Sequence, residues 1–214
     1  MKGSGVFVSG GGDKGGKLIV RRLETGPVDS DGGIAPGVPD RISGGVFVVY
    51  GAFVDSVRNQ GPVTTYGPND MVLDNWGAVD LWIAEDKITS FGASAIGFVN
   101  FGAISRLQIK APIETFGRGA RGFNAYAGTV NTAEFDRIIT HADGAGDSLV
   151  KGVVKRLLAI PLSIKPGGSA REIEVAGGLV AHGPGVAPLE LHGHVETLRI
   201  TEGAAASEQC FDAI

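Results

Sequence analysis

The sequence predicts an all-β protein, and within that class a single-stranded right-handed parallel β-helix, a solenoid with coils of about 25 residues. Three observations lead to this fold. Glycine accounts for 35 of the 214 residues, and it separates short runs rich in Val, Ile and Phe, as in all-β proteins. Strong helix signals are scarce. Residues 61–117 contain two copies and the start of a third copy of one 25-residue unit, a period typical of repeat architectures.

The repeat unit predicts the shape of one coil. The copies read GPVTTYGPNDMVLDNWGAVDLWIAE, DKITSFGASAIGFVNFGAISRLQIK and APIETFG. Each full copy holds three short extended runs with no room for a helix, so the rest of the coil serves as the crossover between parallel strands. Like positions would then stack about 4.8 Å apart, and the usual hand of such crossovers favours a right-handed coil. Two ladders support the period: Gly77, Gly102, Ala127 and Gly152, and Gly67, Gly92, Gly117 and Ala142.

Reading the units position by position predicts the core. Residues of one type recur at the same place in successive units, and alternation along a strand decides which of them point inward. The predicted inward rows are Val63, Ile88, Ile113 and Ile138; Thr65, Ser90, Thr115 and Thr140; Leu73, Phe98 and Phe123; Asn75 and Asn100; and Val79, Ile104 and Ile109.

The chain is expected to form one domain, 1–214, in which the repeat is less regular near both ends. A long loop at 27–44 is expected to be either functional or a cover for the neighbouring coil. The last residues, 201–214, are expected either to cap the edge of the last coil or to form a frayed tail. The expected parts are an early coil at 6–26, a loop at 27–44, regular coils at 45–200 with a shortened coil near 153–168, and a cap or tail at 201–214.

Composition excludes several classes of partner. The formal charge is −4, and no cluster of Lys and Arg lies beside aromatic residues, so nucleic acid is not an expected partner. No run of about 18 apolar residues occurs, so no transmembrane helix and no membrane partner are expected. The sequence shows no signal peptide. The single cysteine, Cys210, is compatible with the cytoplasm, but the native compartment stays open.

Two rows of rings are the main candidate binding residues. Tyr66, Phe91, Phe116 and His141 precede one glycine ladder, and Trp76, Phe101 and Tyr126 precede the other. Alternation predicts that both rows point outward. The rings could stack on one another at the coil corners, form a self-association surface, or offer a platform for sugar rings.

No catalytic, metal or cofactor site is predicted. Asp70, Asp74 and Asp80 occur in one unit, but the next unit supplies no matching acids to make a pair. His192 and His194 face one side of a strand without a third ligand. The glycine-rich residues 9–16 lack the spacing of a phosphate-binding loop, and Cys210 has no histidine near it in sequence.

The repeat and its three runs resemble the right-handed β-helix architecture of pectate lyases, pectinases and phage tailspikes. Those lyases pair an arginine base with acidic Ca²⁺ ligands. The segment Arg118-Gly-Ala-Arg121 is similar to their arginine motif, and it makes both arginines candidate contacts for an anionic ligand. No matching acidic cluster accompanies it, so no catalytic residue is carried over from the resemblance.

The sequence therefore favours a non-catalytic scaffold or binding module that associates with itself. The alternative is a carbohydrate-active enzyme, a polysaccharide lyase or a glycoside hydrolase, with a groove on one β-face. That alternative depends on the resemblance, the aromatic rows and the two arginines, and fold analogy alone is a weak argument for activity.

Overall fold

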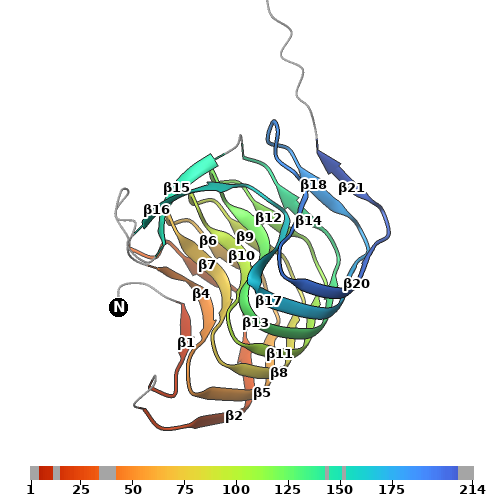
Figure 1. The fold of residues 1–214 in the computed structure, drawn as a ribbon. Helices are drawn as coiled ribbons and strands as arrows, with labels where there is room; N and C mark the ends of the chain where they lie inside the picture. The colour runs from red at the N-terminus through yellow and green to blue at the C-terminus, as the bar shows by residue number, and fades with distance from the viewer. Residues whose placement is uncertain (1–4, 12–14, 34–41, 143–144, 151–152, 207–214) are drawn as a thin grey trace, which may run out of the picture.

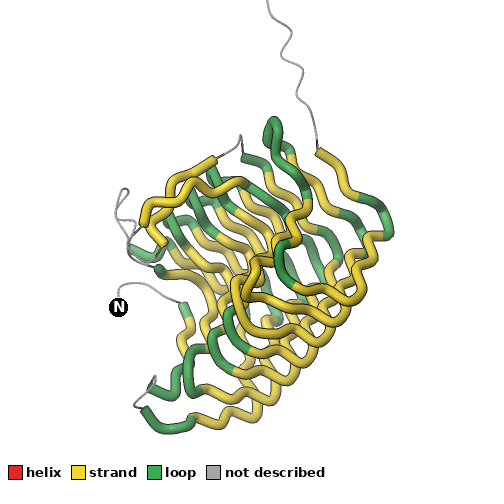
Figure 2. The backbone as a smooth tube through the Cα atoms, in the orientation of Figure 1, coloured by secondary structure: helices red, strands yellow, loops and turns green. Residues whose placement is uncertain are grey.

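Every regular element in the computed structural model is a β-strand, which confirms the predicted all-β class. The structure describes residues 5–11, 15–33, 42–142, 145–150 and 153–206. Within these ranges there is no helix, and therefore none that could cross a membrane. The strands form two parallel sheets and one antiparallel pair, and Figure 2 shows that loops, not helices, join the described strands.

Sheet A has twelve parallel strands and curls back on itself (Figure 1). Its strands lie in two limbs, which are joined by two long strands. The first limb contains β1 (Val6–Val8), β4 (Ser43–Val48), β7 (Asp70–Asn75), β10 (Ile96–Asn100) and β19 (Leu189–Leu191). The second limb contains β2 (Leu18–Thr25), β5 (Ala52–Asn59), β8 (Ala78–Ala84), β11 (Ala103–Ile109) and β20 (His194–Ile200). The joining strands are β13 (Arg121–Phe135) and β17 (Leu162–Val175).

Sheet B is a narrower parallel sheet of seven strands. Each strand has three residues, of which the first and third point into the core in the central strands. Its strands are β3 (Val28–Ser30), β6 (Val63–Thr65), β9 (Ile88–Ser90), β12 (Ile113–Thr115), β14 (Ile138–Thr140), β18 (Leu179–Ala181) and β21 (Ala204–Ala206).

The prediction of a single-stranded right-handed parallel β-helix with coils of about 25 residues is wrong. It required three separate strands in every coil, but two of the three strand positions belong to one curled sheet. The repeat predicts a strand end at Gly77, at Gly102 and at the equivalent position Ala127, which precedes Gly128. Gly128 instead lies inside β13 with φ of 72°, next to a register shift between Ala125 and Ala127. Glycine tolerates this backbone conformation, so the chain turns there without leaving the sheet.

Two further segments differ from the expected organisation. Residues 145–158, which overlap the expected shortened coil near 153–168, form the antiparallel hairpin of β15 (Ala145–Val150) and β16 (Val153–Leu158). Because of this hairpin, Phe123 pairs with Leu162, 39 residues later. The expected loop at 27–44 contains strand β3 and the start of β4. Of the expected cap at 201–214, residues Ala204–Ala206 form a strand of sheet B, and residues 207–214 lie outside the described ranges.

Most of the residue rows predicted from the repeat are confirmed as neighbours in register. Val63, Ile88 and Ile113 are successive partners in sheet B, with Ile138 next to them. Leu73, Phe98 and Phe123 are successive partners in sheet A. Every one of these side chains is at most 1% exposed. Parallel pairing at a 25-residue spacing therefore places like residues directly over one another. The predicted row of Val79, Ile104 and Ile109 is confirmed only in part. Ile104 pairs with Val79, but Ile109 lies on the same strand as Ile104 and pairs with Ala84 and Phe135.

Buried polar groups in the core bond to one another across the strands. Asn75 Nδ2 donates to Asn100 Oδ1 at 2.8 Å, as the predicted stacking of these residues requires. The indole Nε1 of Trp82 donates to Asn59 Oδ1 at 2.9 Å, and Asn59 Nδ2 donates to Thr25 Oγ1 at 2.9 Å. Satisfied buried amides avoid the cost of desolvation and fix the register.

Sheet B approaches sheet A so closely that a side chain would clash at several glycine positions, among them Gly97 and Gly122. A Cβ atom at Gly97 would lie 2.3 Å from Ile113 Cγ2, and one at Gly122 would lie 2.1 Å from Ile138 Cγ2. The glycines therefore give the isoleucines of sheet B the room to reach the interior between the sheets.

Replacing Ile88 by alanine should lower the free energy of unfolding by about 2–5 kcal/mol, because it leaves a cavity in a row that is fully buried. Urea denaturation followed by circular dichroism measures the loss. Thr89→Ala, at the next position of the same strand, is the matched control, because that side chain is only half-buried and should change stability by less than about 1 kcal/mol. Equal losses in the two variants would contradict the register described here.

Candidate functional site

Five rings form one continuous stack that runs across the C-terminal ends of the strands of sheet B, and we call this stack the sheet B column. Each ring follows directly after a strand of the sheet, so the in-register strands bring the rings together. The centroids of successive rings lie 5.4, 5.0, 4.3 and 5.0 Å apart, with interplanar angles of 15° or less. The column contains Tyr66, Phe91, Phe116, His141 and His182.

The sheet B column presents ring edges to the solvent. Tyr66, Phe91 and Phe116 are 51%, 47% and 38% exposed, whereas His141 and His182 are half-buried. Because the rings stack face to face, both faces of Phe91, Phe116 and His141 are covered by their neighbours. A sugar ring stacks on an aromatic face, so the interior of the column does not offer a sugar platform.

The chemistry of the column differs at its two ends. Tyr66 Oη donates to Asp29 Oδ1 at 3.3 Å at one end. Near the other end, burial and the neighbouring His182 hold the pKa of His141 below its usual range. His141 is therefore neutral at pH 7 and packs against Phe116 as an apolar ring.

A second stack lies where the first limb of sheet A turns into the second limb. Trp76 and Phe101 stack with centroids 3.8 Å apart, and Phe101 and Tyr126 stack at 5.2 Å. Tyr50 meets Trp76 edge-on at 5.2 Å. Trp76, Phe101 and Tyr126 are half-buried. The structure thus places both predicted rows on the outside of the sheets and stacks the rings of each row on one another.

Asp74 lies beneath this second stack and is almost completely buried. Its Oδ1 atom has no hydrogen-bond partner, and Trp76 supplies the one side-chain hydrogen bond identified for the carboxyl group. Burial raises the pKa of Asp74 to about 8, against a smaller opposing effect of the Trp76 hydrogen bond. The carboxyl group is therefore mostly protonated at neutral pH.

The two candidate arginines do not converge on one site. Arg118 is exposed on the turn before β13, whereas Arg121 is 3% exposed. Arg121 Nη1 donates to Tyr126 Oη, and its Nε has no partner. With the Asn124 amide turned so that Nδ2 donates to Ser163 O at 3.2 Å, its oxygen also accepts from Arg121 Nη1 at 2.6 Å. Arg121 therefore supports the ring of Tyr126 from beneath the surface.

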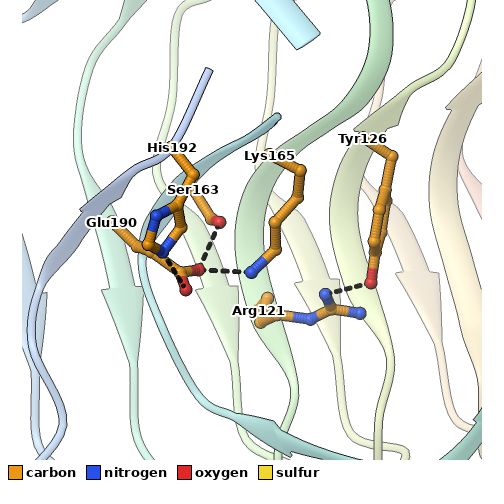
Figure 3. Close-up of polar contacts among 6 residues, drawn as sticks. All are labelled: Arg121, Tyr126, Ser163, Lys165, Glu190 and His192. Atoms are coloured by element: carbon orange, nitrogen blue, oxygen red, sulfur yellow. Dashed lines mark hydrogen bonds and ion pairs between the residues drawn. The ribbon is translucent and has the colours of Figure 1, made fainter. Parts of the chain in front are cut away.

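A polar cluster that the sequence did not predict lies beyond Tyr126, on β17 and around β19. Figure 3 shows Glu190 between Lys165 and His192, while Arg121 contacts Tyr126 separately. Glu190 Oε2 accepts from Ser163 Oγ at 2.7 Å and from Lys165 Nζ, and Glu190 Oε1 lies 3.0 Å from His192 Nε2. Burial would raise the pKa of Glu190, but the hydrogen bonds from Lys165 and Ser163 outweigh it and hold that pKa below its usual value.

The carboxyl groups of this surface lie too far apart to act as a pair. Asp74 on β7 and Glu190 on β19 occupy equivalent positions in sheet A, and the three strands β10, β13 and β17 lie between β7 and β19. Four strand spacings amount to about 19 Å, whereas the two acids of a glycoside hydrolase lie about 5–9.5 Å apart. Asp70 is buried and bonded to Ser43 Oγ and to the Gly67 amide, and Asp80 is exposed on β8.

The histidines do not assemble a metal site in the described part of the chain. No group of three or more His, Cys, Asp or Glu side chains that could hold a metal ion occurs there. His192 contacts Glu190, and His194 is exposed on β20. Cys210 lies outside the described ranges.

Part of this surface could have been found from the sequence. Asp74 and Trp76 are two residues apart on one strand, so alternation alone places them on one side. The Glu190 cluster depends on the pairing of Ser163 with Asn124 and with Glu190. The sequence does not reveal this pairing, because the hairpin at 145–158 interrupts the repeat spacing. Comparison with profiles of known protein families, with curated proteins and with solved structures found no match.

Asp74→Asn should make the protein less sensitive to alkaline pH. The unfolded carboxyl group loses its proton near pH 4, whereas the folded one keeps it up to about pH 8. Between these values, raising the pH therefore lowers stability by up to about 1.4 kcal/mol per pH unit. Asparagine accepts the Trp76 hydrogen bond and does not ionise, so the variant should gain stability over the wild type as the pH rises.

Urea denaturation at several values between about pH 5 and pH 9 measures this gain. Asp80→Asn, which changes an exposed carboxyl group on β8, is the control and should follow the wild-type profile. A constant difference between Asp74→Asn and the wild type at all pH values would show that Asp74 is not buried as described.

Proposed function

We propose that this protein is a non-catalytic scaffold that associates with a second copy of itself through the sheet B column. The observation that carries this proposal is a continuous stack of five rings, of which three are 38–51% exposed. At about 4.8 Å per strand, the stack is about 19 Å long. A contiguous exposed apolar feature of this kind is typical of an interaction surface.

The chemistry of the column favours a protein partner. Its internal ring faces are covered, so sugar stacking would be confined to the two end rings. The exposed edges instead form a narrow apolar ridge, and such a ridge is buried best against another apolar protein surface. Aromatic residues are also enriched at the centres of protein interfaces.

A two-fold contact suits the order of the rings. With the axis at Phe116, the middle ring, the two columns run in opposite directions, and the two Phe116 rings meet. Phe91 then packs against His141 of the partner subunit, and Tyr66 against His182 of the partner subunit. The neutral state of His141 at pH 7 allows this packing without burying a charge. Such an isologous contact closes as a dimer.

The alternative, a carbohydrate-active enzyme, lacks a specific observation in its favour. Asp74 and Glu190 lie about 19 Å apart along their column, and Arg121 is directed to Tyr126 rather than to an open groove. The scaffold therefore accounts better for the side chains that the structure brings together.

Phe91→Ser should weaken dimerisation by about fivefold or more, because truncating a central interface ring costs more than about 1 kcal/mol. Sedimentation velocity over a concentration series measures the dissociation constant. Phe53→Ser is the matched control: Phe53 is 42% exposed, close to the 47% of Phe91, and lies on β5 outside the column. A wild-type protein that stays monomeric, or equal effects of both variants, would refute the proposal.

A further inference from the structure

The two ends of the described fold each present three strands with one unpaired edge. At the N-terminal end these are β1, β2 and β3, and at the C-terminal end β19, β20 and β21. Each pairs with a single neighbouring strand among the described residues. We call these two surfaces the N-face and the C-face. A row of unpaired backbone N–H and C=O groups is a template for pairing with another chain.

The N-face and the C-face are the first and last members of the same three columns. Successive registers connect β1 to β19 along the first limb of sheet A and β2 to β20 along the second limb. The register of sheet B connects β3 to β21 in the same way. A second copy placed with its N-face on the C-face would continue all three columns in parallel.

The side chains that point inward match across such a junction. The described columns align Val6 with Leu189, Val20 with Val195, and Leu23 with Leu198. All six are only partly buried, although the residues at these positions inside the fold are at most 3% exposed. Stacking two copies would complete the burial of these aliphatic side chains, which is favourable in water.

The outward charges match as well. The same alignment places Arg21 beside the partner's Glu196, and Glu24 beside the partner's Arg199. All four side chains are exposed. Opposite charges that face each other across paired strands stabilise the pairing and disfavour a shifted register.

We propose that copies of this chain associate head to tail, with the C-face of one copy pairing in parallel with the N-face of the next. This junction uses surfaces other than the sheet B column, so it goes beyond the proposed dimer and does not depend on it. Because the two faces differ, the contact is heterologous and each added copy leaves one face of each kind open. The proposal therefore specifies chains longer than a dimer.

The test uses lysine at one inward position of each face. Leu23→Lys blocks the N-face and Leu198→Lys blocks the C-face, because an inward-pointing charge prevents edge pairing. Both side chains are only partly buried in the single chain, so the lysine can reach solvent there. Every protein in the test also carries Phe91→Ser, which weakens association through the sheet B column, and is compared at concentrations where that association is not populated. Circular dichroism and thermal unfolding check that each variant is folded.

Sedimentation velocity should show that the parent Phe91→Ser protein forms species larger than a dimer as its concentration rises. Each lysine variant alone should be monomeric. A one-to-one mixture of the two should form a species of twice the monomer mass and nothing larger, because one intact C-face and one intact N-face remain to pair. Ile19→Lys, at an outward and highly exposed position of β2, is the control and should associate like the parent.

A parent protein that stays monomeric at the highest concentration compared would overturn the head-to-tail proposal, as would a mixture that contains only monomers. Either result would show that the C-face and the N-face do not pair in solution. Neither result bears on the sheet B column, whose test compares Phe91→Ser with the wild type.

Discussion

Parallel pairing in register is the constraint on which the rest of this structure depends. It places each residue beside the one about 25 positions away, so a side chain is packed mainly by its own counterparts. Val63, Ile88 and Ile113 make a continuous aliphatic row in this way, and Asn75 satisfies Asn100. A shift of one residue would turn every row toward the opposite face. The close approach of sheet B at Gly97 and Gly122 depends on the same register.

The same constraint decides which surfaces are open to other molecules. The rings of the sheet B column stack on one another and so stabilise the C-terminal ends of the sheet B strands. This stacking covers the faces of the inner rings, and it leaves the ring edges and the two end rings exposed. In the three columns of strands, each inner strand pairs with a neighbour on both sides. Among the described residues, the strands of these columns that pair on one side only are those of the N-face and the C-face. Both proposals therefore follow from surfaces that the stacking leaves incomplete, rather than from a pocket lined by converging acids and bases.

The repeat made much of the fold predictable where its spacing is constant. The core rows that contain Val63 and Leu73, and both aromatic rows, stack as the repeat predicts because residues 61–140 keep a nearly regular step. The sheet architecture was not predictable, because a glycine can end a strand or let it bend, and Gly128 does the latter. The hairpin at 145–158 was not predicted, because it interrupts the repeat spacing. The burial of Arg121, which donates a hydrogen bond to the Tyr126 hydroxyl group, was not predicted either.

The register of sheet B can be measured directly by disulfide formation in a Cys210→Ser background. Thr64 and Thr89 are neighbours on adjacent strands, and Glu114 lies one strand further on. Neighbouring positions about 4.8 Å apart allow a disulfide, whereas positions about 9.6 Å apart exceed the roughly 7 Å limit. The structure predicts that Thr64→Cys with Thr89→Cys oxidises within one chain, and that Thr64→Cys with Glu114→Cys does not. Equal oxidation of both pairs, or none in the first, would contradict the parallel register on which the whole account depends.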